Sequence, residues 1–270
     1  MSRLDQALVS RGLARSRTHA ARLISEGKVS SGGEVLAKAS LQVADDAALD
    51  VTASAEDGYV SRAGHKLAGA LDAFPAVDVA GKRCLDAGAS TGGFTDVLLR
   101  RGAAHVVAVD VGHGQLVPEI RHDVRVSVHE GLNVRYMAPA EIGGPAALTV
   151  ADLSFISLTL VVAPLAACTL PGGDLVLMVK PQFEIGKDRL GRSGVVTSER
   201  ERRLAVGKVA AAAVDAGLDL KGLAQSPLPG QDGNVEYFLW IKRAMSEVPP
   251  KIEERDAAVA ALLGTIWPNH

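Results

Sequence analysis

The sequence predicts an α/β fold, in which a seven-stranded, mostly parallel sheet with helices on both faces follows a small α+β unit. From Lys82 onward, short apolar runs alternate with segments of helical periodicity, which is typical of parallel sheets. A Gly-rich turn follows the first apolar run, within residues 84–95. Residues 1–51 instead show two short helical patterns followed by short strands, so we expect them to form a separate unit.

Length and composition agree with this architecture and with a cytoplasmic protein. The chain has 270 residues, of which 47% are hydrophobic and 22% charged, enough for one α/β domain and a small second one. Its two cysteines, Cys84 and Cys168, lie in apolar runs without metal-ligand spacing, so we expect buried thiols and no metal. No apolar run reaches the ~20 residues that a membrane span needs, and the N-terminus lacks the apolar core of a signal peptide.

The first unit is predicted to span residues 1–51, with helices over residues 3–9 and 16–24. A β region begins at residues 27–30, a hairpin turn follows at 31–34, and short strands follow at 41–43 and 48–51. Residues 1–38 carry seven basic and three acidic side chains, an excess that favours a polyanionic partner, although a solvated surface is the simpler alternative. Residues 52–60 are small, polar and acidic, which indicates a linker.

The second unit, residues 61–270, begins with a helix over 61–74 and ends with one over 251–267. Strands are predicted near residues 82–87, 105–111, 125–130, 147–152, 174–180, 218–225 and 235–243. Residues 226–234 are too few for a crossover helix, so the last two strands should pair antiparallel. Ligands of such sheets bind outside the carboxyl ends of the strands. The expected strand ends at that edge are Asp86, Asp110, Asp152 and Lys180.

The Gly-rich turn favours one cofactor among three. A dinucleotide fold requires G-x-G-x-x-G and a phosphate-binding loop requires a Lys after its last Gly, and neither pattern is present. S-adenosylmethionine is a cation that benefits from nearby carboxylates, which this region supplies. An ordinary strand–helix turn with capping acids is the alternative. The predicted cofactor-binding residues are Asp86, Ala87, Gly88, Ser90, Thr91, Gly92, Gly93, Phe94, Asp110, Val111, Asp152 and Leu153.

Four residues, Lys66, Asp152, Lys180 and Glu236, are the candidate catalytic groups. In this order they resemble the Lys-Asp-Lys-Glu tetrad of ribose 2′-O-methyltransferases. Lys180 is predicted to take or direct the proton of the attacking hydroxyl, because a partly desolvated lysine beside another cation loses its proton more readily, and its neutral amine can then act as a base. Lys66 and Asp152 would orient the oxygen and balance charge, and Glu236 would position a lysine. Neither an amino-methyltransferase N/D-P-P-Y/F motif nor a suitably placed nucleophilic Cys is present, so oxygen is the expected acceptor.

Along nearly its whole length the chain resembles the TlyA (hemolysin A) family of ribosomal RNA cytidine-2′-O-methyltransferases, which carry an S4 RNA-binding domain and an FtsJ-like methyltransferase domain. The match lies in the S4-like start and in residues 61–67, 86–94, 110–116, 152–157, 180–184 and 233–237. The departures are mild: Ala63-Gly64, where many members have Gly-Gly or Gly-Ala, and His113, where Tyr is common. Neither affects the tetrad.

The resemblance implies cytidine 2′-O-methylation in 16S rRNA, 23S rRNA or both, linked to susceptibility to capreomycin-type antibiotics. It implies ribosomal subunits as partners, while a monomer or weak dimer is expected. A basic segment, residues 187–203, is a second candidate RNA contact. The predicted RNA-binding residues are Arg3, Arg11, Arg15, Arg17, Lys28, Arg62, Lys187, Arg189 and Arg192. A non-catalytic ribosome assembly factor and a membrane-lytic hemolysin are the alternatives; neither the target nucleotide nor the subunit follows from the sequence.

Overall fold

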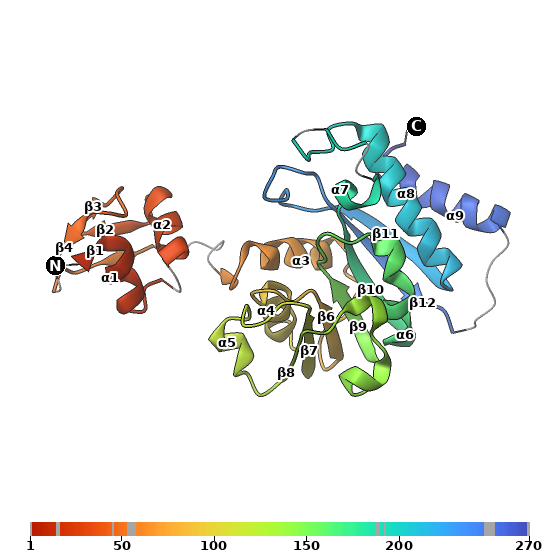
Figure 1. Cartoon of the computed structure of the whole chain (residues 1–270), viewed down its shortest axis with the longest axis horizontal. Helices are drawn as coiled ribbons and strands as arrows, with labels where there is room; N and C mark the ends of the chain where they lie inside the picture. Colours follow the sequence, from red (N-terminus) through yellow and green to blue (C-terminus); the bar gives the residue numbers. More distant parts are fainter. Residues whose placement is uncertain are drawn as a thin grey trace. The chain divides into compact units, whose positions relative to one another are not determined.

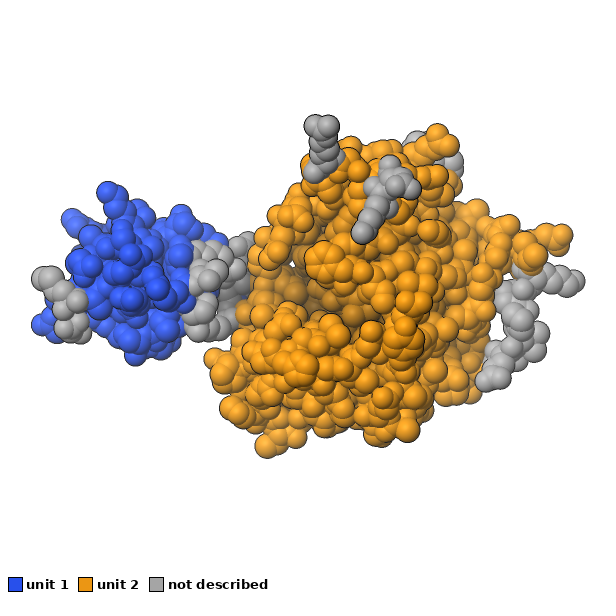
Figure 2. Space-filling view, viewed as in Figure 1, with its two compact units in different colours: residues 1–58 blue, residues 59–270 orange. Residues whose placement is uncertain are grey.

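The chain forms two compact units, residues 1–58 and residues 59–270, which Figure 2 colours separately. The computed structural model describes residues 2–14, 17–44, 46–52, 58–186, 189–191, 193–245 and 252–268. The predicted linker, residues 52–60, includes residues 53–57, which lie outside this described part of the chain. None of the described helices combines the length and the apolar character that crossing a membrane requires.

The first unit packs two helices on short antiparallel strands. Helices α1 (Leu4–Ser10) and α2 (Arg17–Ser25) enclose a small core with Val29, and Leu4, Leu8 and Leu23 are at most 1% exposed. β2 (Val29–Ser31) pairs with β3 (Glu34–Val35) and β5 (Asp50–Val51), while β1 (Ser2–Arg3) pairs with β4 (Gln42–Val43). The hairpin turn predicted at 31–34 is confirmed, because Ser31 pairs with Glu34 across two glycines of positive φ.

The second unit contains the predicted seven-stranded sheet. Its strands are β6 (Arg83–Ala87), β7 (His105–Asp110), β8 (Val126–Glu130), β9 (Ala146–Ala151), β10 (Thr169–Val179), β11 (Leu218–Gln225) and β12 (Tyr237–Arg243), in the order β11-β12-β10-β9-β6-β7-β8 (Figure 1). The pairs from β10 to β8 are parallel, and β12 is antiparallel to both of its neighbours. The antiparallel seventh strand is therefore confirmed.

Helices cover both faces of this sheet. On β10, Leu175 and Leu177 belong to one apolar layer and Val176 and Met178 to the other, because successive side chains of a strand alternate between faces. The first layer is covered by α6 (Val162–Ala167), α8 (Glu199–Asp215) and α9 (Ile252–Gly264), and the second by α3 (Arg62–Ala73), α4 (Gly93–Arg100) and α5 (Pro118–Arg121). The short helix α7 (Pro181–Glu184) follows β10, and 3₁₀ turns occupy Val134–Tyr136, Pro139–Ile142 and Leu158–Leu160.

The longest strand departs from its predicted bounds. β10 starts at Thr169, five residues before the expected start, and its register with β9 shifts between Thr169 and Asp174. The intervening Pro171-Gly172-Gly173 resembles a turn in the sequence. In the structure it is an irregular stretch inside one strand, because Thr169 is held independently by hydrogen bonds to Thr149 Oγ1 at 2.7 Å and to the Leu165 carbonyl at 2.8 Å.

The C-terminal segment docks on the second unit. Trp267 is 3% exposed, and its ring lies 5.2 Å from that of Tyr237, the first residue of β12. Leu262 and Leu263 of α9 are buried in the same apolar layer. The helix predicted at 251–267 spans Ile252–Gly264, and together with Trp267 it contributes to the core beside β12, the strand that directly follows the candidate site residue Glu236.

We expect Trp267→Ala to lower the free energy of unfolding of the second unit by about 3–5 kcal/mol, because it removes a large buried ring and leaves a cavity. Guanidinium unfolding followed by the fluorescence of Trp240 measures this. Leu204→Ala, on the exposed side of α8, is the matched control and should change stability by less than about 0.5 kcal/mol. Equal effects of the two substitutions would contradict the docked position of Trp267.

Candidate active site

The carboxyl ends of the parallel strands meet at one edge of the sheet. Ala87, the last residue of β6, pairs with Ala151, the last residue of β9. Because β12 runs in the opposite direction, its first residue, Tyr237, pairs with Val179, the last residue of β10. The residues that follow β9 and β10 and the residue that precedes β12 therefore lie at this edge; they are Asp152, Lys180 and Glu236.

Two lysines at this site each form an ion pair with a carboxylate. Lys180 Nζ lies 2.6 Å from Asp152 Oδ1 and donates a hydrogen bond to Ser154 Oγ at 3.0 Å. Lys66 Nζ, on α3, donates to Glu236 Oε2 at 2.6 Å, with side chains 11% and 3% exposed. Removing one partner of so buried a pair leaves an uncompensated charge. The four predicted catalytic residues thus form two ion pairs, and each lysine contacts a carboxylate.

Glycines allow the close approaches around the Lys66–Glu236 pair. A Cβ on Gly230 would lie 2.8 Å from Glu236 Oε1, and one on Gly64 would lie 2.5 Å from Tyr59 Cβ. A Cβ on Gly93, the first residue of α4, would meet Ser61 Oγ at 2.2 Å. The start of α3 therefore packs directly against the start of α4, which follows the Gly-rich turn.

The Gly-rich turn after β6 is held by one carboxylate of the neighbouring strand. Asp110, at the end of β7, accepts hydrogen bonds from the backbone N–H of Ser90 at 2.8 Å and of Gly112 at 2.7 Å. Gly88 has a φ of +87°, and a Cβ there would lie 2.5 Å from the Asp152 carbonyl oxygen. Gly92 also adopts positive φ, at +95°, as the residue that precedes α4. Glycine is therefore required at two positions of this turn.

The remaining predicted cofactor residues divide into buried and accessible positions. Ala87 and Phe94 are 0% and 2% exposed and belong to the two apolar layers, so they anchor the two ends of the turn in the core and are not accessible to a ligand. Thr91 and Val111 are exposed, and Leu153 lies against Gly88. The accessible positions surround the edge at which Asp152 and Asp110 lie.

A small cleft adjoins the turn. Its lining comes from the ends of three neighbouring strands and the segments that follow them: Ala89, Ser90, Ala108, Asp110, Gly112, Gln115, Leu116, Val128 and Glu130. Glu130, at the end of β8, accepts the backbone N–H of Gly114 at 2.8 Å and pairs with Arg121. Neither Gln115 nor Glu130 is among the residues predicted from the sequence, although Glu130 ends a predicted strand as Asp86 and Asp110 do.

Asp86 is a buried carboxylate whose pKa is strongly perturbed. It is 0% exposed, and its Oδ2 accepts a hydrogen bond from Thr95 Oγ1 at 2.6 Å. Its Oδ1 has no hydrogen-bond partner among the described residues. Burial, with the nearby charges of Asp152 and Asp110, raises the pKa of Asp86 to about 7. An unsatisfied buried carboxyl oxygen of this kind suits a cationic ligand.

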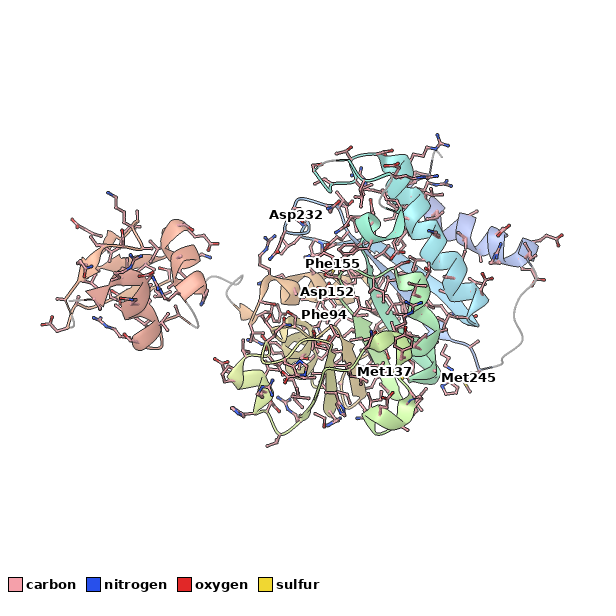
Figure 3. All side chains as sticks on the ribbon, in the orientation of Figure 1. Phe94, Met137, Asp152, Phe155, Asp232 and Met245 are labelled. Carbon is pink, nitrogen blue, oxygen red and sulfur yellow. The ribbon has the colours of Figure 1, made fainter. Side chains whose placement is uncertain are left out.

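Phe155 is an exposed aromatic residue beside the ion pairs, and it is not among the residues predicted from the sequence. It follows Asp152 by three residues (Figure 3), is 91% exposed and has a φ of +63°, which is unusual for a bulky side chain. Its ring lies 5.3 Å from that of Phe183, on α7. Strained, exposed residues of this kind cluster at functional sites. The sequence signal was an aromatic residue shortly after a strand end.

A buried glutamate links the loop after β9, which follows Asp152, to the helix α7, which follows Lys180. Glu184, at the end of α7, is 2% exposed and accepts hydrogen bonds from Ser157 Oγ and from the backbone N–H of Leu158, the latter at 2.8 Å. Burial raises the pKa of this carboxyl, although both hydrogen bonds oppose the shift. The loop after β9 and the helix after β10 are thereby held against each other, and with them Asp152 and Lys180.

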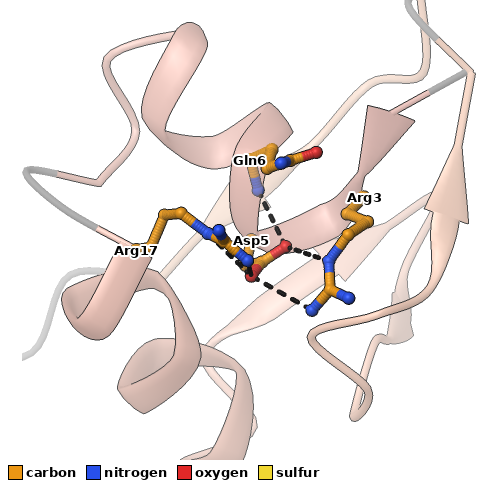
Figure 4. Close-up of polar contacts among 4 residues, drawn as sticks. All are labelled: Arg3, Asp5, Gln6 and Arg17. Carbon is orange, nitrogen blue, oxygen red and sulfur yellow. Dashed lines mark hydrogen bonds and ion pairs between the residues drawn. The ribbon is translucent and has the colours of Figure 1, made fainter.

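The predicted RNA-binding residues of the first unit take different roles. Arg3 and Arg17 both bind the carboxylate of Asp5 (Figure 4). Arg11 donates to the carbonyl oxygens of Ala44 and Ala47, so its guanidinium holds a loop of the unit. Lys28 forms an ion pair with Glu26. Arg15 lies outside the described residues.

In the second unit, Arg62 is exposed at the start of α3, and Arg189 is exposed in the segment before α8. Lys187 and Arg192 lie outside the described residues, and the basic residues from Arg200 onward belong to α8. The described part of the chain contains no group of three or more His, Cys, Asp or Glu side chains that could hold a metal ion.

Comparison with known proteins places these features in a family. Residues 59–243 match the model of the FtsJ-like methyltransferases, and residues 2–47 match that of the S4 domain. The chain is 54% identical over 241 residues to the 16S/23S rRNA (cytidine-2′-O)-methyltransferase TlyA of Mycobacterium tuberculosis, covering 89% of this chain and 90% of that protein. It is 35% identical over 238 residues to Hemolysin A of Brachyspira hyodysenteriae, covering 87% and 98%.

The likeness extends to a solved structure. A protein of Streptococcus thermophilus superposes with a TM-score of 0.72 at 37% sequence identity, covering 99% of this chain and 98% of that one. Both the sequence likeness and the structural likeness thus span the two units. The chain belongs to the TlyA family of FtsJ-like methyltransferases, which join an S4 domain to a methyltransferase domain.

Proposed function

We propose that this protein transfers a methyl group from S-adenosylmethionine to the ribose 2′-hydroxyl of a cytidine in ribosomal RNA. The observation that carries the proposal is the pairing of Lys180 with Asp152 and of Lys66 with Glu236 at the edge where the Gly-rich turn lies. The relative from Mycobacterium tuberculosis, which performs this reaction on 16S and 23S rRNA, supports the substrate class. Ribosomal RNA as substrate implies a cytoplasmic location, and we propose a monomer or weak dimer.

The residues around the Gly-rich turn fit S-adenosylmethionine. The unpartnered Oδ1 of Asp86 suits a cation, and Gly88 lets the turn pack closely against the Asp152 carbonyl, where a Cβ would lie only 2.5 Å from its oxygen. Asp110 and Glu130, at the ends of the next two strands, supply carboxylates that can accept hydrogen bonds from the hydroxyl groups of the ribose. When bound, this cofactor supplies a methyl group that is already activated by its attachment to a cationic sulfur.

The lysines would act on the acceptor hydroxyl. The 2′-oxygen must lose its proton as it forms the new bond to carbon. Lys180 would orient this oxygen and direct its proton to the carboxylate of Asp152, whose Oδ1 lies 2.6 Å from Lys180 Nζ. Lys66, fixed by Glu236, would hold the same oxygen from the side of α3. Alignment of the acceptor by fixed groups supplies a large part of the acceleration in such transfers.

Phe155 would hold the target nucleotide. Sequence-specific recognition of RNA mostly targets single-stranded, unstacked bases, and aromatic side chains stabilise such bases by stacking. Phe155 follows Asp152 by three residues, and its exposed ring packs near that of Phe183. The hydrogen bond from the Leu158 N–H to Glu184 holds the loop that carries Phe155. We propose that it stacks on the extruded cytosine, while the first unit binds phosphates elsewhere on the RNA.

The reaction is tested by tritiated methyl transfer from S-adenosylmethionine to purified 30S and 50S subunits. We expect incorporation by the wild-type protein and a loss of at least about 100-fold for Lys180→Ala, because the 2′-oxygen loses the group that directs its proton. Cofactor binding by this variant, measured by calorimetry, should persist. Cofactor binding by the wild type without transfer to either subunit would contradict the proposal and favour a non-catalytic assembly factor.

Cofactor affinity should depend on pH through Asp86. A cationic ligand favours the carboxylate over the carboxylic acid, so affinity should rise as the pH increases from about 6 to about 8, with release of a proton. Calorimetry in buffers of different ionisation enthalpy measures both effects. Asp86→Asn should bind weakly and without this dependence. An equally steep pH dependence in Asp86→Asn would contradict the assignment of Asp86.

The raised pKa of Asp86 also determines how the stability of the cofactor-free protein depends on pH. Its folded pKa, about 7, lies above the ordinary value of 3.8, so the folded state binds a proton that the unfolded state has released. The contribution of this proton to the free energy of unfolding is complete below about pH 4 and is lost as the pH rises to about 7. Unfolding of Asp86→Asn should show a shallower decrease over this range.

Phe155→Ala should reduce methyl transfer by about 5- to 150-fold without changing cofactor affinity, since stacking on one base contributes about 1–3 kcal/mol. Phe155→Tyr, which keeps the ring, is the matched variant and should retain most of the transfer. Single-turnover transfer to ribosomal subunits measures both. Equal losses in the two variants would show that the ring face is not what the reaction requires.

A further inference from the structure

The first unit contains two arginines from different elements that converge on one buried carboxylate. Arg3 directs Nε to Asp5 Oδ1 at 3.0 Å and Nη2 to Oδ2 at 3.3 Å. Arg17, the first residue of α2, directs Nε and Nη2 to Asp5 Oδ2 at 3.2 and 2.8 Å. The backbone N–H of Gln6 also donates to Oδ1, at 3.0 Å (Figure 4). One carboxylate thus fixes the orientation of two guanidinium groups.

Burial separates the roles of the three side chains. The side chain of Asp5 is 6% exposed, whereas those of Arg3 and Arg17 are 41% and 59% exposed. The hydrogen bonds from both arginines lower the pKa of Asp5 to about 2, so the carboxylate keeps its charge at physiological pH. The carboxylate therefore lies beneath two cationic groups that remain accessible to solvent.

Each guanidinium keeps donors outside its contacts with Asp5. A guanidinium has five N–H groups, and Nε with one Nη–H from each arginine face the carboxylate. The other N–H groups belong to side chains that are 41% and 59% exposed and that meet at the same carboxylate. A planar fork of this kind matches the oxygens of a phosphate, and side-chain entropy that is already lost to Asp5 need not be lost again on binding.

We infer that Asp5 is a positioning residue for RNA: it orients Arg3 and Arg17 as a paired site for backbone phosphates. This inference rests on the proposed function, which makes RNA the substrate. It assigns to an acidic residue a favourable effect on the binding of a polyanion. Charge alone predicts the opposite, because Asp5 lowers the positive charge of this surface.

Asp5→Asn separates an effect of charge alone from an effect of arginine orientation, because the two predict opposite changes in RNA affinity. It removes one negative charge, so charge alone predicts tighter binding. Loss of orientation predicts that the full chain binds protein-free 16S and 23S rRNA at least about fivefold more weakly in filter binding. The slope of log affinity against log salt concentration should also decrease in magnitude by about 0.7–0.9 for each phosphate that the variant no longer binds. Equal or tighter binding by Asp5→Asn would overturn the inference.

Matched variants control for charge and for folding. Glu34→Gln removes one negative charge from the exposed strand β3 of the same unit and should leave affinity unchanged or slightly raised. The double variant Arg3→Lys/Arg17→Lys keeps Asp5 and both positive charges but lacks the planar fork. It should also bind more weakly, which tests the inference even if Asp5→Asn unfolds the first unit; unchanged affinity in the double variant would overturn it.

The outcome is distinguishable from failure of the proposed function. Affinity for S-adenosylmethionine should be the same in Asp5→Asn and wild type, because the cofactor residues belong to the second unit. If the wild type binds rRNA but methylates neither subunit, the proposed reaction is wrong, and the comparison of Asp5→Asn with wild type still decides the role of Asp5. Absence of rRNA binding by the wild type would overturn the role of the paired arginines itself.

Discussion

The structure depends on one geometric constraint: the carboxyl ends of the parallel strands and the amino end of the antiparallel strand β12 share one edge of the sheet. This arrangement lets Lys66 contact Glu236, although the two residues are 170 positions apart in the sequence. It also places Lys180 and Asp152 directly after the adjacent strands β10 and β9, where they form an ion pair. A shift of one residue in the pairing of β12 with β10 would reverse the face to which the side chains of β12 point and separate Glu236 from Lys66.

Charge is organised around this edge in two ways. The two lysines are each balanced by a carboxylate, which makes their burial tolerable and fixes their positions. Asp86 lacks such a cation, and its pKa is raised to about 7 by burial and by neighbouring acids. An incoming cationic cofactor would supply the missing charge. Asp5 in the first unit shows the opposite arrangement, because this buried carboxylate is balanced by two arginines that remain accessible.

The sequence predicted the features that depend on local pattern and chain length. The antiparallel strand followed from the short connection at 226–234, and the positions of Asp86 and Asp110 followed from the ends of apolar runs. It did not predict contacts that depend on packing between distant segments. The hydrogen bonds of Glu184 to the loop after β9 and the inward-facing guanidinium of Arg11 are of this kind. The exposure of Phe155 arises from a backbone conformation that its residue type disfavours, which no periodicity reveals.

The position of the transferred methyl group tests the account most directly. Unmethylated 30S and 50S subunits would be incubated with the protein and S-adenosylmethionine carrying a deuterated methyl group, and the RNA then digested to nucleosides for mass spectrometry. We expect label in 2′-O-methylcytidine. Label on a cytosine ring atom or its amino group would contradict this expectation, because the proposed acceptor is the ribose 2′-oxygen.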